Sequence, residues 1–392
     1  MSGSVKIEAP SGWRVVQLRE LAKITAGGDY EPKTASPVKT DRHPFPVYAN
    51  ANERKAFHSY SSTFKHPAGA VTITARGTLG FSQFRSEPFT AIGRLLVVWP
   101  DSQFDGRYLA ECLNSQVEFA VESTGVPQLT GPQAGSYEIL IPENVIEQEA
   151  IAEALSDADA LIEGLERLIA KKRLVKQGAM QDLLTAKRRL PGFSGKWVEC
   201  KLGERGQFFK GSGVRKDDAK SGFLPCVRYG ELYTLHHDVV RNFASFISAE
   251  VAKTARALEF GDILFAGSGE TKEEIGKCAV VMHEKKTYAG GDIIVFRPDR
   301  DDPIFLSYLL NTPAVQKQKA RKGQGDSVVH ISTIALGGIE LRLPSEEEQR
   351  SISVVLEDMD AEIQVFEARL EKARQIKEGM MQTLLNGRIR LV

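Results

Sequence analysis

Two stretches of the chain contain residue types and spacings that could bind a cofactor. The run Phe265-Ala-Gly267-Ser-Gly269 resembles a glycine loop that binds S-adenosylmethionine in methyltransferases. Such a loop should be accompanied by an Asn/Asp-Pro-Pro-aromatic motif, and the sequence contains no Pro-Pro pair. Gly276-Lys277 lies seven residues after Gly269 and is followed by Cys278, so the spacing of a phosphate-binding loop is missing. We therefore interpret the first run as a glycine turn between strands, matched by Gly77 in the first half.

Catalytic and metal-binding patterns are equally weak. Asp262 with Glu270-Thr-Lys272 has the order of a carboxylate and E-x-K in metal-dependent nucleases, but this spacing arises often by chance and has no counterpart in the first half. The seven histidines form no H-E-x-x-H spacing, and no Ser-His-Asp set can be assigned. We predict no catalytic residue, no metal ligand and no bound cofactor in this chain, which leaves recognition and scaffolding.

Composition narrows the class of protein. The chain has 392 residues, of which 42% are hydrophobic and 26% charged, as expected of a soluble protein with more than one domain. No stretch approaches the roughly 18 apolar residues of a membrane span, and the polar start is unlike a signal peptide. The four cysteines are scattered, which favours a reducing, cytoplasmic location. Lys plus Arg and Asp plus Glu both total 51, and this zero net charge argues against a simple basic nucleic-acid-binding protein.

The chain repeats itself over about half its length. The pattern that begins at Trp13 recurs at Trp197, and the offset between the copies grows from 184 to 201 along the chain. The block with offset 201 matches best, and its repeated residues in the first half include Ile151, Leu155, Asp157, Asp159, Ile162, Gly178, Met180, Gln181, Leu183, Leu184 and Leu190. We interpret the duplication as two similar modules that do one job on two different objects; structural economy alone is the alternative.

Each repeat ends in a predicted long helix. Apolar residues spaced 4-3-4-3-4 form an a/d seam in both copies. Ala158 and Met359 complete this spacing, and the other ten seam residues are Ile151, Leu155, Ile162, Leu165 and Ile169 in the first helix and Ile352, Leu356, Ile363, Phe366 and Leu370 in the second. Each helix should run about 40 residues, or ~60 Å, which equals roughly 17–18 base pairs of duplex. The two stripes most simply pair as an antiparallel coiled coil, unless each packs only on its own domain.

The remaining sequence predicts an α/β fold class with an internal pseudo-two-fold repeat. Strand-rich globular domains are predicted over residues 1–142 and 191–344, and the long helices over 143–190 and 345–392. Apolar runs predict strands at Val71–Arg76 (half-buried), Leu95–Trp99, Ile293–Phe296 and Phe223–Arg228. A turn is predicted at Tyr229–Tyr233, and short helices at Tyr108–Ser115 and Phe305–Thr312.

Four features of the sequence occur in a specific order. The Trp13…Leu18…Gly27 pattern opens each half. The second half contains Arg228-Tyr-Gly-Glu-Leu-Tyr233, Gly261-Asp-Ile-Leu-Phe265 and Ser268-Gly-Glu-Thr271. The helices begin with Pro142…Glu147-Gln148…Ile151 and Pro344…Glu348-Gln349…Ile352, and both end with Gly-x-Met-Gln-x-Leu-Leu. Together these features resemble the specificity (S) subunit of type I DNA restriction–modification systems, over nearly the whole chain.

The resemblance implies a division of labour. Each globular domain would be a target-recognition domain that reads one half of a split, asymmetric site in double-stranded DNA, and the helices would set the gap between the half-sites. Two modification subunits with the S-adenosylmethionine site would dock on the helices and domains, and restriction subunits that use ATP and Mg would join them. The S subunit itself would be non-catalytic. The alternative is a coiled-coil assembly scaffold without DNA specificity.

Base reading needs donors and acceptors at base edges, such as Asn or Gln for adenine and Arg for guanine. The first domain offers Tyr48, Asn50, Asn52, Arg54, Lys55, Tyr60, Arg76, Thr78 and Gln128. The second offers Lys210, Ser212, Arg215, Lys216, Arg228, Tyr229, Tyr233, Ser268, Glu270, Thr271, Lys272, Lys322, Gln324 and His330. Any one of them could instead be a solvated surface side chain. Because the domains carry net charges of +1 and +3 and the helices −1 and −3, neutrality does not exclude DNA but predicts weak non-specific binding by this chain alone.

Overall fold

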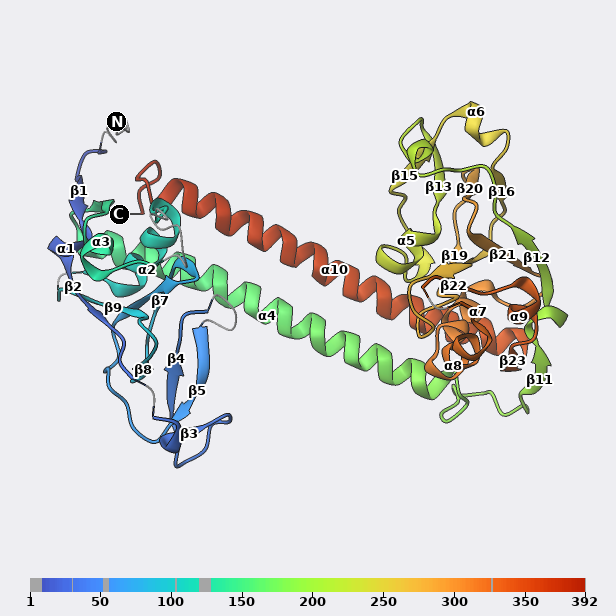
Figure 1. The fold of residues 1–392 in the computed structure, drawn as a ribbon, viewed down its shortest axis with the longest axis horizontal. Helices are drawn as coiled ribbons and strands as arrows, with labels where there is room; N and C mark the ends of the chain where they lie inside the picture. The colour runs from blue at the N-terminus through green and yellow to red at the C-terminus, as the bar shows by residue number, and fades with distance from the viewer. Residues whose placement is uncertain are drawn as a thin grey trace. The chain divides into compact units, whose positions relative to one another are not determined.

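The computed structural model describes residues 9–29, 31–51, 56–102, 104–119, 128–325 and 327–391. The chain divides into two compact units, one formed by Met1–Arg167 with Glu367–Val392 and the other by Leu168–Phe366. Each unit contains one globular domain and one part of each long helix, α4 (Val145–Leu183) and α10 (Glu346–Leu384) (Figure 1). Each of these helices has 39 residues, which corresponds to about 58 Å.

The domain of the first unit, called the first domain, is built from two four-stranded sheets and a two-stranded ladder. The sheets have the strand orders β2-β9-β6-β7 and β3-β5-β4-β8, and β1 pairs with β10. The strands are β1 (Trp13–Gln17), β2 (Ala22–Ala26), β3 (Ala35–Ser36), β4 (Phe45–Tyr48), β5 (Phe57–Ser61), β6 (Val71–Arg76), β7 (Thr78–Phe84), β8 (Thr90–Ala91), β9 (Leu96–Pro100) and β10 (Glu138–Pro142). The short helices are α1 (Leu18–Leu21), η1 (Pro32–Thr34), α2 (Gly106–Gln116) and α3 (Gly131–Gly135). Asp105 caps α2 by accepting bonds from two backbone amides of its first turn.

The second unit repeats this plan in its own globular domain, the second domain. A five-stranded sheet has the order β12-β21-β17-β19-β14, a four-stranded sheet the order β15-β13-β20-β16, and β11 pairs with β23 and β18 with β22. The strands are β11 (Val198–Lys201), β12 (Gly206–Lys210), β13 (Leu224–Val227), β14 (Asp238–Val240), β15 (Ser245–Ile247), β16 (Arg256–Leu258), β17 (Ile263–Ala266), β18 (Ser268–Gly269), β19 (Cys278–Val281), β20 (Thr287–Ala289), β21 (Ile293–Pro298), β22 (Val329–His330) and β23 (Glu340–Leu343). The helices are η3 (Leu202–Glu204), η4 (Asp217–Ala219), α5 (Tyr229–Thr234), α6 (Ala249–Ala252), α7 (Pro303–Leu310), α8 (Pro313–Lys322) and α9 (Thr333–Gly337).

The long helices pair in antiparallel fashion within each unit. Ion pairs join Glu166 to Arg374 in the first unit and Lys172 to Glu362 in the second, both at 2.6 Å. Seven of the twelve predicted seam residues are buried, while Ala158, Ile162, Met359, Phe366 and Leu370 are partly buried. The coiled coil predicted from the 3.5-residue period is therefore present.

Each domain also receives the far end of the other repeat's helix. The core of the first domain contains Ile151 and Leu155 from the start of α4, and Leu384 and Leu385 from the end of α10 and the residue that follows it. The core of the second domain contains Ile352 and Leu356 together with Leu183 and Leu184. The alternative in which each helix packs only on its own domain is therefore wrong.

Local structure differs from the prediction in four places. The long helices end earlier than residue 190 and the chain end, because Ala186 (φ 58°) and Gly387 (φ 71°) leave the helical conformation. Strand β6 is buried at five of its six positions rather than on one face. Residues Tyr229–Thr234 form helix α5 instead of a turn, with Glu231 accepting a bond from the Arg228 amide. The run Phe265–Gly269 lies in β17 and β18, so the turn falls on residues 270–277.

Candidate nucleic-acid interface

In the first domain, the β6–β7 hairpin brings three of the predicted DNA-binding residues together. Gly77 adopts φ +78° at the tight turn, a conformation that favours glycine. Arg76 and Thr78 flank it and are exposed. Gln128 is also exposed and forms an isolated bridge with Arg76. The side chain of Arg94, which the sequence did not single out, donates a bond of 2.9 Å to Oε1 of Gln128. These polar groups form one exposed set of donors and acceptors.

Asn50 lies beneath this set and bonds to the backbone in two directions. Its Oδ1 accepts a bond of 2.7 Å from the amide of Ala75, at the end of β6. Its Nδ2 donates to the carbonyl of Gly93, in the turn that carries Arg94. In this arrangement Asn50 holds the hairpin and the turn together, and its role in base reading stays a prediction.

The two predicted tyrosines of this domain pack against neighbours. The guanidinium carbon of Arg85 lies 3.5 Å from the centre of the Tyr48 ring. Burial raises the pKa of Tyr48, although the nearby Arg85 opposes this shift. The ring of Tyr60 lies 4.8 Å from that of Phe57. The predicted contacts of Asn52, Arg54 and Lys55 fall outside the described residues.

The second domain builds a corresponding set around strands β18 and β22. Ser268 Oγ lies 2.9 Å from Nδ1 of His330, and the Tyr233 hydroxyl donates to the Ser268 carbonyl at 3.0 Å. Ser268 is buried, whereas His330 and Gln324, joined by two backbone bonds, are exposed. Gln128 and His330 occupy equivalent places, because each stands two residues before the residue that caps α3 or α9.

The loop at residues 270–277 follows β18 and carries Glu270, Thr271 and Lys272, which are all exposed. Its base is held by Lys319 of α8, whose buried Nζ donates a bond of 2.7 Å to the carbonyl of Gly276. Burial lowers the pKa of Lys319 to about 8. Lys319 is a supporting residue that the sequence did not reveal, because its partner lies 43 residues away.

The other predicted residues of the second domain surround neighbouring turns. The amide of Gly211 donates to the carbonyl of Ile293, and that of Gly267 donates to the carbonyl of Asp292. The loop after β12 and the residue before β18 therefore both contact the chain at the start of β21. Ser212 donates to Thr254 at 2.8 Å. Residues exposed or partly exposed in this region are Lys210, Arg215, Lys216, Arg228 and Tyr229. Lys322 ends α8 and is partly buried, and its role in base reading stays a prediction.

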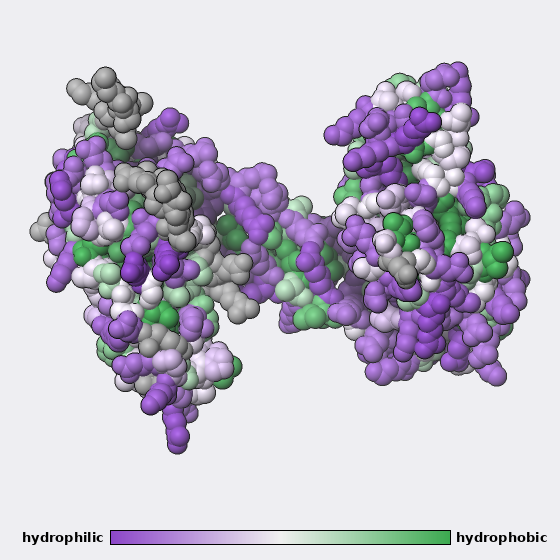
Figure 2. Space-filling model, viewed as in Figure 1, coloured by the Kyte–Doolittle hydropathy of each residue, from purple (hydrophilic) through white to green (hydrophobic). Residues whose placement is uncertain are grey.

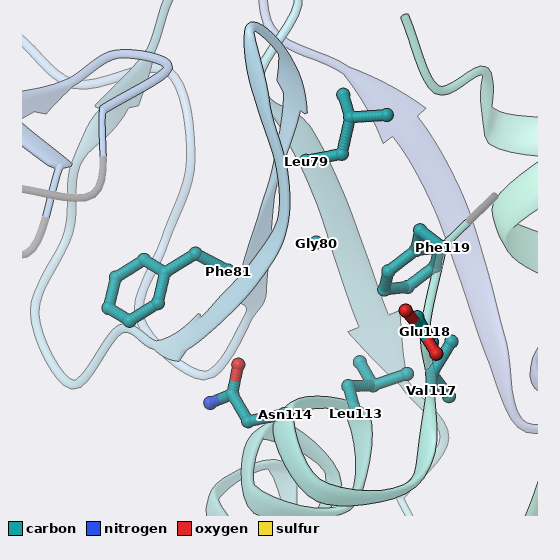
Figure 3. A pocket seen from close by; sticks show the side chains of 8 residues that line it. All are labelled: Leu79, Gly80, Phe81, Leu113, Asn114, Val117, Glu118 and Phe119. Atoms are coloured by element: carbon teal, nitrogen blue, oxygen red, sulfur yellow. The ribbon is translucent and has the colours of Figure 1, made fainter. Parts of the chain in front are cut away.

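A hollow of about 300 Å³ lies beside the β6–β7 hairpin (Figure 3). Gly80 has φ +88°, and a Cβ there would stand 2.4 Å from a ring carbon of Phe119. Asn114 bonds both the amide and the carbonyl of Ser82 at 2.8 Å and fixes β7 on α2. The hollow is lined by Leu79, Gly80, Phe81, Leu113, Asn114, Val117, Glu118 and Phe119. Glu118 is the only titratable side chain among them, so the lining offers no acid–base pair.

The repeated residues at the helix ends meet in two equivalent clusters. Arg189 forms paired bonds of 2.5 Å to the carboxylate of Glu348 and lies 5.9 Å from the centre of the Trp197 ring. In the first unit, Arg390 forms the same paired bonds to Glu147 and lies 6.0 Å from the Trp13 ring. We call the ion pairs Arg189–Glu348 and Arg390–Glu147 the helix-end clasps.

The glutamine after each clasp glutamate ties the helix to its domain. Gln148 accepts a bond of 3.2 Å from the amide of Asp105, the residue that caps α2. Gln349 accepts a bond of 3.0 Å from the amide of Asp302, which caps α7. The Glu-Gln pairs noted in the sequence thus have a structural role in both repeats.

Among the described residues, no helix has the length and apolar character needed to cross a bilayer.

Comparison with known proteins covers both repeats. Residues 10–171 and 194–375 match the family model described as the type I restriction modification DNA specificity domain. The specificity subunit of the type I restriction enzyme MjaVIII from Methanocaldococcus jannaschii is 24% identical over 349 residues, which are 83% of this chain and 77% of that protein. The EcoKI specificity subunit from Escherichia coli K12 is 21% identical over 198 residues, or 49% of this chain and 42% of that protein.

Solved structures share the fold. The type I restriction–modification S subunit from M. genitalium matches with a TM-score of 0.70 at 16% identity, over 98% of both chains. A chain from a structural study of type I complex assembly matches with a TM-score of 0.54 at 15% identity, over 97% of this chain and all of that one. A scaffold without DNA specificity has no support among these similarities. With both of its repeats matched, the chain belongs to the type I restriction–modification DNA specificity family, as a specificity subunit with two target-recognition domains.

Proposed function

We propose that the chain reads a bipartite, asymmetric DNA site and holds the other subunits of a type I complex around it. One observation carries this proposal: equivalent places in the two domains present different exposed polar side chains. Arg76 and Gln128 occupy this place in the first domain, and His330 with Gln324 in the second. Because base edges differ in their donors and acceptors, different side chains at equivalent places select different half-sites.

In this proposal the chain determines which DNA sequence is recognised and contributes less to the affinity for the DNA backbone. Its formal net charge is zero, and non-specific affinity grows with the number of phosphates that basic residues neutralise. Hydrophilic residues cover much of the visible surface of each unit (Figure 2). Other subunits of the complex would therefore provide much of the contact with the phosphate backbone.

We further propose that this chain is non-catalytic and cytoplasmic. Two modification subunits would bring S-adenosylmethionine, and restriction subunits would bring ATP and Mg. The helices offer apolar side chains for docking, since Leu161, Leu174, Val175, Val354, Val365 and Ile376 are each more than half exposed. Val175 and Ile376 are repeat equivalents, which fits one modification subunit on each module. The unpaired cysteines suit a reducing compartment.

The test is to reconstitute the chain with its modification subunits and map methylated bases across random DNA. A split site with two defined halves is expected. Replacing Gln128 by alanine should relax only the first half by about tenfold, and His330→Ala only the second, in line with the worth of one base contact. The exposed Arg300→Ala variant serves as the matched control. A single uninterrupted site, or methylation without sequence preference, would contradict the proposal.

A further inference from the structure

A lysine repeated in both helices contacts one carboxylate of the paired helix and one of the globular domain in each unit. Lys377 of α10 and Lys176 of α4 are 201 residues apart in the sequence. In the first unit, Nζ of Lys377 lies 2.7 Å from Asp159 of α4 and 3.7 Å from Glu111 of α2. Each of these contacts joins the end of one helix to a different element, so Lys377 connects the helix pair to the first domain.

The second unit contains the equivalent arrangement. Nζ of Lys176 lies 2.6 Å from Asp360 of α10 and 3.7 Å from Asp238 at the start of β14. Asp159 and Asp360 are again repeat equivalents, so the helix-to-helix contact is identical in both units. We call Lys377–Asp159–Glu111 the first joint and Lys176–Asp360–Asp238 the second joint.

In both joints the lysine and the domain-side carboxylate are mostly shielded from water, while Asp159 of the first joint is 42% exposed. The side chains of Lys377 and Glu111 are 18% and 20% exposed, and those of Lys176 and Asp238 are 14% and 15% exposed. Screening weakens ion pairs at such positions less than it weakens pairs on an open surface. Burial raises the pKa of Glu111 and of Asp238, and the neighbouring lysine opposes the shift in each. In each joint the lysine therefore partly offsets the cost of burying the domain-side carboxylate.

The second joint has more support than the first. Tyr308 of α7 donates a bond of 2.6 Å to Asp360, and Asn311 donates one of 2.8 Å to Asp238. Asp238 itself has φ +56°, a conformation that Asp and Asn tolerate better than most residues. Glu111 stands at the place in α2 that Tyr308 takes in α7, at the repeat offset of 197. A tyrosine thus takes the place of Glu111 in the second unit, and the domain-side carboxylate of the second joint comes from the start of β14 instead.

We propose that the two joints fix the angle between each recognition domain and the paired helices, and so determine how strictly the complex selects the number of base pairs between its half-sites. Apolar packing between helix and domain is non-directional, whereas a lysine paired with one carboxylate on the other helix and one on the domain limits how the domain can turn against the helices. One additional base pair moves a half-site by about 3.4 Å and turns it by roughly 35°. A domain held at a fixed angle cannot follow that change. This inference rests on the proposed function.

The test uses the reconstituted complex and duplexes that carry its mapped half-sites at the native spacing, or with one base pair added or removed. Glu111→Gln keeps the shape of the first joint and removes its charge, and Asp238→Asn does the same in the second joint while suiting the positive φ. In each variant, the preference for native spacing, measured as a ratio of methylation rates, should fall at least tenfold with unchanged half-sites. Glu138→Gln, an exposed carboxylate on β10, should leave the ratio unchanged.

Three outcomes would overturn the inference. An unchanged ratio in Glu111→Gln would do so even if Asp238→Asn failed to fold, because the first joint tests the idea alone. Altered base preference within a half-site would assign these residues to base reading instead. Equal methylation of all spacings by the unmodified complex would contradict the proposed function as well as the role of the joints. Failure of the joints alone would instead leave the unmodified complex selective for the native spacing, so the two failures can be told apart.

Discussion

Asn50 shows how a residue chosen for recognition can act through the backbone. Its amide suited adenine on chemical grounds, and that was all the sequence could indicate. The groups that it bonds belong to Ala75 and Gly93, which are 25 and 43 residues away. No local pattern contains such distances. Arg76 and Gln128, in contrast, were predicted as separate candidates, and folding brings them together.

Replacing Asn50 by alanine should therefore destabilise the first domain rather than change a base contact. The variant loses two bonds and leaves the partly buried amide of Ala75 without its acceptor, which costs about 1–3 kcal/mol. Urea unfolding of the full chain measures this loss. Gln128→Ala, in the exposed set, should keep the free energy of unfolding and change only the methylated sequence. If Asn50→Ala instead kept the free energy of unfolding and changed the methylated sequence, Asn50 would be a base-contacting residue.

Lys319 makes the stability of the second unit depend on pH. Burial lowers its pKa to about 8 in the folded chain, while an unfolded lysine titrates near 10.4. Between these values the unfolded chain binds more protons, so the free energy of unfolding rises with pH, by about 3 kcal/mol over the window. The difference between the unmodified chain and Lys319→Met, followed by urea unfolding at pH 7.5, 8.5 and 9.5, isolates this contribution. A difference that stays flat would show that Lys319 stays protonated in the folded chain over this range, so that its pKa is not lowered.

At the scale of elements, the 3.5-residue period predicted both long helices and their pairing. The period could not show where the helices end, because Ala186 adopts φ 58° without being glycine. It also could not show the helix-end clasps. Arg189 and Glu348 are 159 residues apart, and Arg390 and Glu147 are 243 apart. The sequence contained only a hint, which was that Trp, Glu-Gln and Arg all recur.

Breaking one clasp should be costly, because it leaves a buried carboxylate without its partner. The side chains of Glu348 and Glu147 are 2% and 0% exposed. Arg189→Met should lower the free energy of unfolding by roughly 3–5 kcal/mol, and adding Glu348→Gln should recover part of the loss. The neighbouring exposed Arg188→Met should cost little. Equal losses in both arginine variants would contradict a specific role of the clasp.

Lengthening the helices tests the spacer directly. One heptad inserted after Glu166 and one after Phe366 keeps the seam in phase and adds about 10.5 Å to each helix. The gap between half-sites should grow by about three base pairs, with both half-sites unchanged, as seen by methylation mapping. An insertion of four residues, which shifts the seam, is the control and should reduce assembly of the complex. Changed half-sites would refute the idea of a spacer.

For the molecule as a whole, the duplication in the sequence predicted two modules correctly but not how they are connected. The apolar residues Leu384 and Leu385 were assigned to the last helix, and their place in the core with Trp13 could not be read from spacing. The same holds for Leu183 and Leu184 in the second core. The domain surfaces were the hardest to predict, since loop geometry decides which polar groups are exposed.

A circularly permuted chain tests this connection. Arg390 donates a bond of 2.8 Å to the carbonyl of Ser11, so a short linker from Leu391 to Pro10 should join the ends without strain. New ends can be opened within residues 191–195, which are mostly exposed. The thermal midpoint should stay within about 4 °C of that of the original chain, with the same methylated site. The control is a chain that carries the linker residues after Leu391 but keeps its original ends. If this control folds and the permuted chain does not, the linker cannot replace the natural connection between α4 and β11.

The helix-end clasps also bear on how such a gene can change. Each clasp joins an arginine from one repeat to a glutamate from the other, and both clasps use the same residue types at the same repeat positions. The end of either helix therefore carries the arginine that either domain requires. A crossover within the repeated helix coding sequence would exchange one reading domain for another and still yield matched ends. New target sequences can then arise by recombination, without any mutation that must first be compensated.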